Sequence, residues 1–339
     1  MELLTISTYD LGKMFWLALI SFLIAVAWTP ILTNFLYKNN LGKRIRDSKS
    51  APIMAALHAK KAGTPTMGGI LIWITTAVLT LLFNLERSAT WLPVFCLVST
   101  GIVGLVDDLW NVRGIGPKGG GMGFLQKFTL YAAIAFVGAW WFYFKLDWNS
   151  IHIPGMGDYI IGAWYIPLFV VVLVWMAFSS NETDGLDGLA GGIFAFAYGA
   201  YAFIALTQGK AELAAFCATV MGSLLAFLWF NIPPARFFMG DTGSMALGMT
   251  LGVIAFLTNS VVVLPIITLV FLVEGLSFLL QFASKKLRNG KKIFLSSPIH
   301  HHFEAIGWPE YKITMRFWII GAVSAVAGLI IAIVGRGTL

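Results

Sequence analysis

Long apolar segments recur along this chain with only short polar connections between them, and this pattern restricts the fold more than any other feature. A helix needs about 20 apolar residues to cross the hydrocarbon core of a bilayer. Ten segments approach or exceed that length: 14–37, 68–84, 91–110, 126–145, 163–178, 188–207, 212–229, 243–258, 261–283 and 314–335. We therefore expect an all-α polytopic membrane protein with about ten transmembrane helices, forming a single domain over residues 1–339.

The composition excludes the main alternatives to a membrane protein. Charged residues make up 12% of the chain and hydrophobic residues 58%, whereas soluble domains carry about 25% charged residues. A soluble enzyme and a disordered chain are both excluded on this ground. The two cysteines, Cys96 and Cys217, lie in apolar segments and predict neither a disulfide framework nor a metal site.

Lys and Arg residues divide unequally between the two sides of the predicted spans. If the N-terminus is outside, eighteen of the 23 fall in the inner connections. Cytoplasmic loops carry such an excess, so we expect both termini on the extracytoplasmic side. The net charge of +7 then reflects membrane topology, and no nucleic-acid partner is expected. A small outer β-hairpin is expected near 148–162, where polar and apolar residues alternate around Pro154-Gly155.

The predicted inner connections contain a group of carboxylates. Asp107 and Asp108 end the third span, Asp184 and Asp187 precede the sixth, and Asp241 precedes the eighth. Asp184, Asp187 and Asp241 are equally well explained as helix N-caps. The adjacent pair lies at the C-terminal end of its helix, where the helix dipole opposes negative charge. Two carboxylates there require a cation, and Mg²⁺ bound by carboxylates and substrate phosphates meets that requirement.

Glycine-rich turns accompany these acids. Residues 63–69 open the second span, Gly185 and Gly188 flank Asp187, and Gly240 is followed by Asp241. Glycine lets the backbone approach a ligand closely, and helix N-termini bind phosphate. Each turn is common in membrane proteins, but together with acids and basic loops they predict a phosphate-rich substrate with Mg²⁺.

Two further features of the sequence invite a functional interpretation. Three consecutive histidines, 300–302, occur in a chain with only five, and they are able to bind metal, contact a diphosphate or shuttle protons. We expect an extended segment here, which would direct only one or two rings to the same ligand. Glu274 lies inside the ninth span, where an ionisable group is a functional candidate. The simpler interpretation is that Glu274 pairs with a polar neighbour or faces a water-filled groove, with a kink permitted at Gly275.

Five motifs together carry a resemblance to a known family. They are Thr64–Gly69, Asp107–Asp108, Asp184–Leu189, Met239–Ser244 and His300–Glu304. In this order they resemble the polyprenyl-phosphate N-acetylhexosamine-1-phosphate transferases. The first and last motifs are most similar to the branch that transfers phospho-N-acetylmuramoyl-pentapeptide. The likeness covers nearly the whole chain, including the ten spans.

The resemblance implies a reaction of bacterial cell-wall synthesis at the inner (cytoplasmic) membrane, with the active site on its cytoplasmic face. UDP-N-acetylmuramoyl-pentapeptide (UDP-MurNAc-pentapeptide) and undecaprenyl phosphate would give lipid I and UMP. It also implies Mg²⁺ as cofactor and a homodimer. Two alternatives stay open: a transferase for N-acetylglucosamine-1-phosphate, and a transporter. The second fits less well, because transport sites lie near the bilayer midplane.

The resemblance also assigns roles to individual residues. Asp241 would be the main Mg²⁺ ligand, and Asp107 and Asp108 would lie at the metal and the lipid phosphate. One of the pair is a candidate to deprotonate that phosphate, but a phosphate monoester with a second pKa near 6 does not need a strong base. Asp184 would support the metal or nucleotide region. Uridine would contact Lys61, Gly185, Leu186, Asp187, Asn231 and Phe238. The other substrate contacts would come from Thr66, Lys127, Asn181, His300 and His301. Direct attack by the lipid phosphate and a covalent aspartyl-phosphate route are both compatible with this set.

Three positions depart from the family pattern. Asn111 stands where family members usually carry a lysine, three residues after the aspartate pair, and Arg113 or Lys118 lies near enough in sequence to supply that charge. Phe178 and Glu182 replace an asparagine and an apolar residue on either side of Asn181. These departures concern details of substrate contact.

Overall fold

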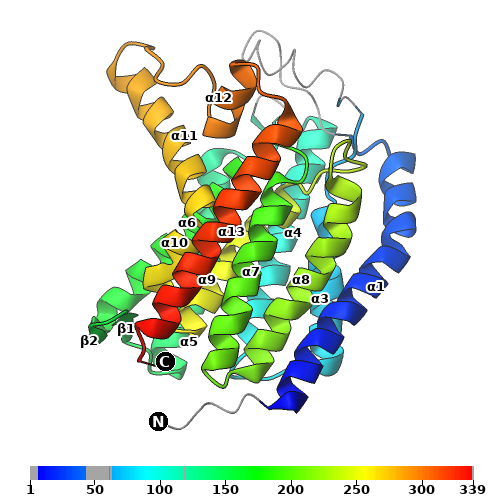
Figure 1. The fold of residues 1–339 in the computed structure, drawn as a ribbon. Helices are drawn as coiled ribbons and strands as arrows, with labels where there is room; N and C mark the ends of the chain where they lie inside the picture. The colour runs from blue at the N-terminus through cyan, green and yellow to red at the C-terminus, as the bar shows by residue number, and fades with distance from the viewer. Residues whose placement is uncertain (1–6, 43–60, 62, 118–119, 338–339) are drawn as a thin grey trace.

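The computed structural model describes residues 7–42, 61, 63–117 and 120–337. Helices dominate it (Figure 1). The α-helices are α1 Thr8–Lys38, α3 Gly69–Phe83, α4 Trp91–Arg113, α5 Phe124–Lys145, α6 Tyr165–Thr183, α7 Leu189–Thr207, α8 Ala211–Asn231, α9 Asp241–Leu257, α10 Leu264–Ile267, α11 Leu269–Leu287, α12 Ile299–Ala305 and α13 Glu310–Val334. The short elements are β1 Ser150–Ile153, β2 Gly157–Ile160 and the 3-10 turns η3 Gly162–Trp164 and η4 Val261–Val263. Each predicted span has a helical counterpart, although the ninth is interrupted.

Length and hydropathy support fewer spans than the predicted ten. Within the described residues, six helices are long and apolar enough to cross a membrane, and the number rises to seven if a bent pair counts as one span. α3 and α9 are apolar but shorter. The protein is thus a multi-pass membrane protein. Its number of spans and the side on which its termini lie stay predictions.

The ninth predicted span is broken rather than continuous. Val261–Ile267 and Leu269–Leu287 meet at an angle of 80°, so that α11 leans away from the bundle (Figure 1). The break falls at Thr268, whose backbone lies outside the helical region. Gly275, where the sequence permits a kink, lies seven residues further on, within the continuous helix α11.

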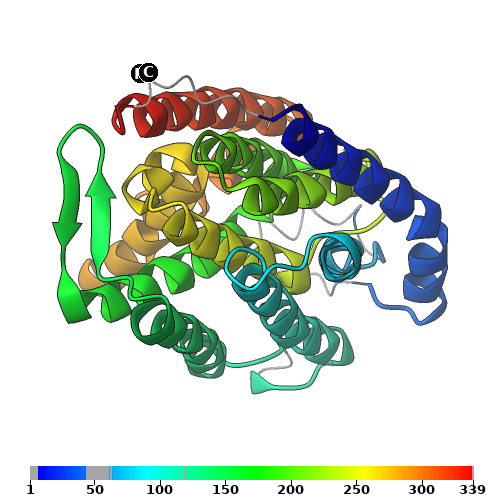
Figure 2. The same cartoon turned by 90° about the horizontal axis from the view of Figure 1, so that it is seen from below.

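The bundle is organised around α9. Every residue of this helix from Thr242 to Leu257 is buried, because α4 and α6 pack along it. α8 packs against α1 and α7, and α13 covers α7. The view along the bundle shows α1 and α13 on its outer side (Figure 2). Since α9 faces protein rather than lipid, its length is set by its neighbours.

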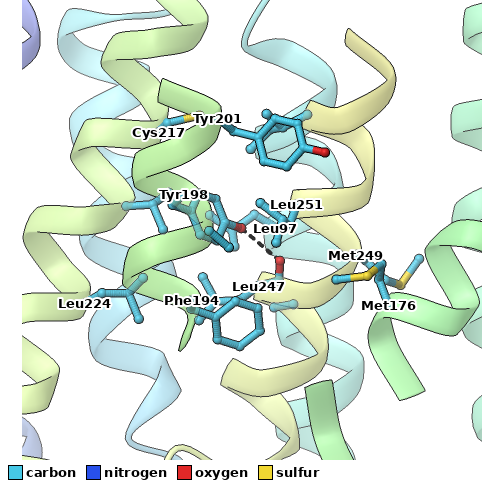
Figure 3. Close-up of a cluster of buried hydrophobic side chains, with 14 of the residues drawn as sticks. Leu97, Met176, Phe194, Tyr198, Tyr201, Cys217, Leu224, Leu247, Met249 and Leu251 are labelled. Atoms are coloured by element: carbon cyan, nitrogen blue, oxygen red, sulfur yellow. Dashed lines mark hydrogen bonds between the residues drawn. The ribbon is translucent and has the colours of Figure 1, made fainter. Parts of the chain in front are cut away.

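Two buried tyrosine hydroxyls of α7 are satisfied by backbone carbonyl groups. The Tyr198 hydroxyl on α7 donates to the Leu247 carbonyl oxygen of α9 at 2.8 Å (Figure 3). Tyr201, one turn away, donates to the Ser260 carbonyl oxygen at 3.2 Å. Such bonds remove the cost of burying a hydroxyl. Cys96 and Cys217 are buried free thiols, as the sequence predicts.

The expected β-hairpin is confirmed. β1 and β2 pair antiparallel, with Ser150 opposite Ile160 and Ile153 opposite Gly157. The Gly155 N–H donates to the Gly335 carbonyl oxygen at 2.9 Å, so the hairpin lies beside the end of α13. The start of α1, the end of α13 and the hairpin all lie at one end of the bundle (Figure 1). The acidic motifs lie at the other end, beside α12.

Candidate active site

The centre of the site is an ion cluster that joins three helices. The Lys127 ammonium on α5 lies 2.5 Å from Asp107 Oδ2 on α4 and 2.7 Å from Asp241 Oδ2 at the start of α9. Asn181 Nδ2 on α6 donates to Asp241 Oδ1 at 2.7 Å. Asp107 is almost fully buried. Residues far apart in the sequence thus converge on one point, which we call the acidic centre (Asp107, Lys127, Asn181 and Asp241).

The aspartate pair differs from the expectation in two ways. α4 continues to Arg113, so the pair does not end its helix and the helix dipole does not decide its role. The neighbouring Asp108 accepts the Thr242 N–H at 3.1 Å and so satisfies a free donor at the start of α9. The cation beside Asp107 is Lys127 rather than Arg113; Lys118 lies outside the described residues.

Asp184, Asp187 and Asp241 do not act as helix N-caps. Gly240 and Gly188 occupy the N-cap positions of α9 and α7, and Asp184 follows the end of α6. Asp184 Oδ2 instead accepts the Gly240 N–H at 3.1 Å. The turn from 184 to 188 therefore contacts the segment that carries Asp241, and the capping interpretation is wrong.

The segment before α3 pairs with the segment before α9. The Phe238 N–H donates to the Pro65 carbonyl oxygen at 2.8 Å, and Gly68 and Gly69 donate to the carbonyl oxygens of Phe238 and Met239 at 2.7 and 2.9 Å. This pairing brings the first motif of the sequence against the fourth.

Gly69 is required by this close approach, because a Cβ there would lie 2.2 Å from Gly243 Cα. The adjacent Thr66 is buried, and its hydroxyl has no hydrogen-bond partner among the described residues. A Cβ at Gly240 would lie 2.7 Å from that hydroxyl oxygen. Thr66 therefore lies beside the segment that carries Asp241, and its contact with substrate stays a prediction.

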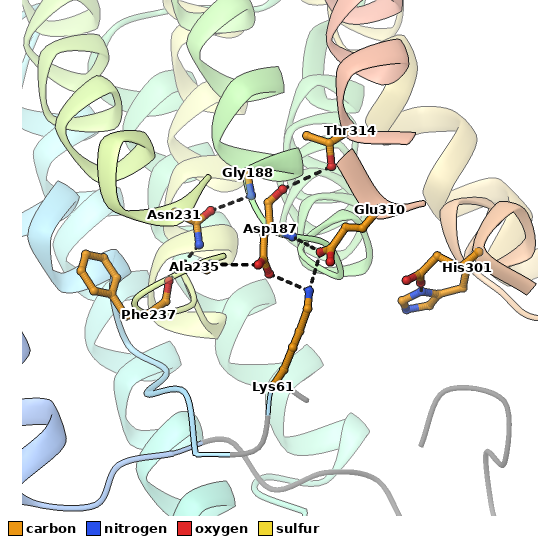
Figure 4. Close-up of polar contacts among 10 residues, drawn as sticks. Lys61, Asp187, Gly188, Asn231, Ala235, Phe237, His301, Glu310 and Thr314 are labelled. Atoms are coloured by element: carbon orange, nitrogen blue, oxygen red, sulfur yellow. Dashed lines mark hydrogen bonds and ion pairs between the residues drawn. The ribbon is translucent and has the colours of Figure 1, made fainter. Parts of the chain in front are cut away.

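Lys61 forms a second cluster with Asp187 and Glu310. Its ammonium lies 2.7 Å from Asp187 Oδ1 and also contacts Glu310 Oε1 (Figure 4). Asp187 Oδ2 accepts the Ala235 N–H at 3.0 Å. Burial lowers the pKa of Lys61, but the carboxylates of Glu310 and Asp187 raise it by more, so its net pKa lies above the usual value. Lys61 is thus a charged group that two acids hold in place.

The remaining predicted uridine contacts surround this cluster. Asn231 Oδ1 accepts the Gly188 N–H at 2.9 Å, and its amide donates to the Phe237 carbonyl oxygen (Figure 4). The Phe238 ring is partly buried, and its centroid lies 5.8 Å from the Lys61 ammonium. Leu186, within the turn from 184 to 188, is buried. We call Lys61, Asp187, Asn231, Phe238 and Glu310 the Lys61 cluster.

The histidine motif forms the short helix α12 rather than the extended segment expected. His300 is fully buried, and its Nδ1 lies 2.9 Å from Glu274 Oε2. This confirms that Glu274 pairs with a polar neighbour. His301 Nδ1 lies 2.7 Å from Glu304 Oε2. A helix turns successive side chains by about 100°, so the three rings point in different directions.

The His300 ring reaches the turn between α6 and α7. A Cβ at Gly185 would lie 2.2 Å from His300 Nε2, an atom without a hydrogen-bond partner in the described part of the chain. The turn therefore touches all parts of the site: Asp184 faces the acidic centre, Gly185 faces His300, and Asp187 faces Lys61.

Sequence reasoning missed two residues of the site. Glu310 follows Pro309 at the start of the last helix, and only its long-range contact with Lys61 reveals a role. Tyr131 lies one turn after Lys127 on α5, and its buried hydroxyl has no hydrogen-bond partner among the described residues. The spacing of Tyr131 from Lys127 was a usable signal, because residues four apart share a helix face.

The acidic centre fits a hard cation. Carboxylate oxygens of Asp107 and Asp241 converge on the Lys127 nitrogen, so both are directed at one positive group. Over residues 7–42, 61, 63–117 and 120–337, no group of three or more His, Cys, Asp or Glu side chains is arranged to hold a metal ion. Mg²⁺ does not require such a group, because it commonly uses one or two carboxylates together with substrate phosphates.

Comparison with known proteins identifies the family. Residues 90–259 match the model of glycosyl transferase family 4, and residues 61–72 match signature 1 of the phospho-N-acetylmuramoyl-pentapeptide-transferases. The transferase of that name from Chloroflexus aggregans is 39% identical over 96% of this chain and 91% of its own length. Those from Geobacillus thermodenitrificans and Levilactobacillus brevis are 39% and 38% identical, over 93% and 91% of this chain and 96% and 95% of their own lengths. The chain therefore belongs to the phospho-N-acetylmuramoyl-pentapeptide-transferase family.

Proposed function

We propose that this protein transfers phospho-N-acetylmuramoyl-pentapeptide from its UDP derivative to undecaprenyl phosphate, giving lipid I and UMP. The observation that carries the proposal is the similarity to transferases of that name at about 39% identity over 96% of the chain. The substrates also suit the molecule. One is a membrane lipid and the other a nucleotide, and the acidic motifs of a membrane-embedded bundle meet at one of its ends.

The two ion clusters fit different parts of the nucleotide sugar. The charge of Lys61 is offset by Asp187 and Glu310, so it suits a neutral uracil carbonyl better than a diphosphate. The half-buried ring of Phe238 is suited to stacking on the base. The acidic centre and His300 would then lie toward the diphosphate and the sugar, on the other side of the turn between α6 and α7.

The reaction requires little acid–base chemistry. A phosphate monoester has a second pKa near 6, so undecaprenyl phosphate is mostly dianionic at pH 7. Its oxygen attacks the β-phosphorus of the nucleotide, the new P–O bond forms, and the bond to the bridging oxygen breaks so that UMP leaves with the electron pair. We favour this direct route over an aspartyl-phosphate intermediate, because the nucleophile needs no activation.

The protein's own groups would orient the reactants. Asp241 and Asp107 would hold Mg²⁺, which when bound offsets the phosphate charges. Asn181 and Lys127 fix the orientation of the Asp241 carboxylate through bonds of 2.7 Å each. Asp108 fixes the backbone of the first turn of α9 through the Thr242 N–H. In this arrangement the metal ligands are positioned before the substrate binds.

The cellular setting is part of the same proposal. We place the protein in the bacterial inner membrane as a homodimer, with both termini outside and the site on the cytoplasmic face. The excess of basic residues on that side supports the orientation, although several of those residues lie within 43–60, outside the described residues.

A donor panel tests the proposal. Purified protein in detergent, with undecaprenyl phosphate and Mg²⁺, should release UMP from UDP-N-acetylmuramoyl-pentapeptide and form a lipid-linked product. The control is the same reaction with UDP-N-acetylglucosamine, for which we expect no release. UMP release from the second donor alone, or solute transport without any lipid-linked product, would overturn the assignment.

A further inference from the structure

Three polar side chains of α13 lie one turn apart on a single face of the helix. They are Glu310, Thr314 and Trp318, with spacings of four residues. Residues at this spacing lie above one another along a helix. The face they share is directed at the bundle interior, at the turn that connects α6 to α7 (Figure 4).

Each of these side chains bonds to the backbone of that turn. Glu310 Oε1 accepts the Asp187 N–H at 2.7 Å. The Thr314 hydroxyl donates to the Asp187 carbonyl oxygen at 3.2 Å, and Trp318 Nε1 donates to the Gly188 carbonyl oxygen at 3.0 Å. The last helix thus fixes three backbone groups of the turn that links the acidic centre to the Lys61 cluster.

Glu310 differs from the other two because it also bears a charge. The same oxygen that accepts the Asp187 N–H contacts the Lys61 ammonium. Among the described residues, the carboxylates that contact the Lys61 ammonium are those of Glu310 and Asp187.

We propose that Glu310 is a positioning residue for the donor nucleotide, which fixes Lys61 and the Asp187–Gly188 turn and so sets the affinity for the uridine part of the substrate. This inference rests on the proposed function, because it takes the Lys61 cluster as the uridine subsite. Glu310 lies at the base of that subsite and does not touch the reacting phosphates in this assignment. It should therefore affect nucleotide binding and leave the acceptor lipid unaffected.

The substitution Glu310→Gln isolates the charge. A glutamine keeps an oxygen that accepts from the Asp187 N–H and the Lys61 ammonium, but it removes the negative charge that balances Lys61. We expect KM for the UDP substrate and Kd for UDP to rise about 10-fold, the loss that follows when one charge-assisted hydrogen bond is weakened. We expect kcat and KM for undecaprenyl phosphate to stay within about twofold.

A matched control and a coupled variant separate positioning from general damage. Glu212→Gln removes a carboxylate that also pairs with a lysine, Lys13, at the opposite end of the bundle, and should leave both KM values unchanged. In a Lys61→Gln background, Glu310→Gln should have little further effect, because the partner of the charge is already gone. Additive effects of the two substitutions would overturn the proposal.

Two measurements separate this inference from the proposed function. Transfer by the wild-type protein tests the function, and direct calorimetric binding of UDP tests the positioning role without turnover. If the wild-type protein is active but Glu310→Gln binds UDP with unchanged affinity, the positioning role is wrong and the proposed function still stands. If Glu310→Gln fails to fold, Thr314→Val tests the same turn without a change in charge; it should weaken UDP binding selectively, and equal losses for UDP and lipid would contradict the inference.

Discussion

Replacing Lys127 by methionine removes the ammonium group that lies between Asp107 and Asp241. The substitution keeps the length and apolar stem of the side chain, so packing along α5 should change little. The two carboxylates would then face each other without their shared cation. Protein stability should fall, and a divalent cation should restore more of it than in the wild-type protein.

The structure sets the size of this effect. The two carboxylate oxygens lie within 2.5 and 2.7 Å of the same nitrogen, so they are no more than about 5 Å apart. Removing the ammonium leaves these buried charges without compensation, a change that costs about 3 kcal/mol. At roughly 2 °C per kcal/mol for a chain of this size, the apparent Tm should fall by about 6 °C.

Thermal unfolding in detergent, with and without Mg²⁺, measures both parts of the prediction. Lys127→Met should unfold at a lower temperature without metal and should gain more from Mg²⁺ than the wild type does. Lys286→Met is the control, because that lysine is exposed at the end of α11. An unchanged Tm together with an unchanged response to Mg²⁺ would refute the convergence of Asp107 and Asp241 on one cation.

Three other outcomes follow. Asp241→Asn should lower transfer activity by about 100-fold while the protein stays folded; near-normal turnover would contradict its role as the main metal ligand. Gly69→Ala should severely reduce the yield of folded protein, because the added Cβ would clash with the Gly243 backbone. Gly12→Ala is the control, since no heavy atom lies within 4 Å of its added Cβ. Equal yields of the two variants would contradict the close approach of Gly69 to Gly243. Burial lowers the pKa of His300, but the Glu274 carboxylate raises it by more. The stability that this pair contributes should thus be complete below about pH 6.5 and be lost as pH rises through the higher folded-state pKa. Apparent Tm between pH 6 and 9 should show this loss, and an identical profile in Glu274→Gln would disprove it.

The helices were predictable because each one follows from a local run of apolar residues in the sequence. Every predicted span corresponds to helical structure, and the hairpin near 148–162 forms where the alternation placed it. The break at Thr268 was not predictable in this way, since the residues on both sides are equally apolar and only packing decides where the helix turns. The histidine helix α12 was missed because seven residues carry too little periodicity to distinguish a helix from an extended segment.

The candidate site also has a part that the sequence predicted and a part that it did not. The acidic motifs pointed to Asp107 and Asp241, and the family resemblance pointed to Lys127, as candidate site residues. They did not reveal that Lys127 bridges the two acids, or that Asp108 supports the start of α9. The contacts of Lys127 and Asp108 with α9 join residues more than a hundred positions apart along the chain.

The sequence by itself determined that this is a helical membrane protein and to which family its motifs belong, because both follow from residue types and their spacing along the chain. Only the tertiary structure decided which side chain each buried charged group pairs with. It paired Glu274 with His300 and placed Glu310 on Lys61. The physical reason is that a charge buried in an apolar bundle must find its counterpart in space, and no local pattern specifies which distant residue supplies it.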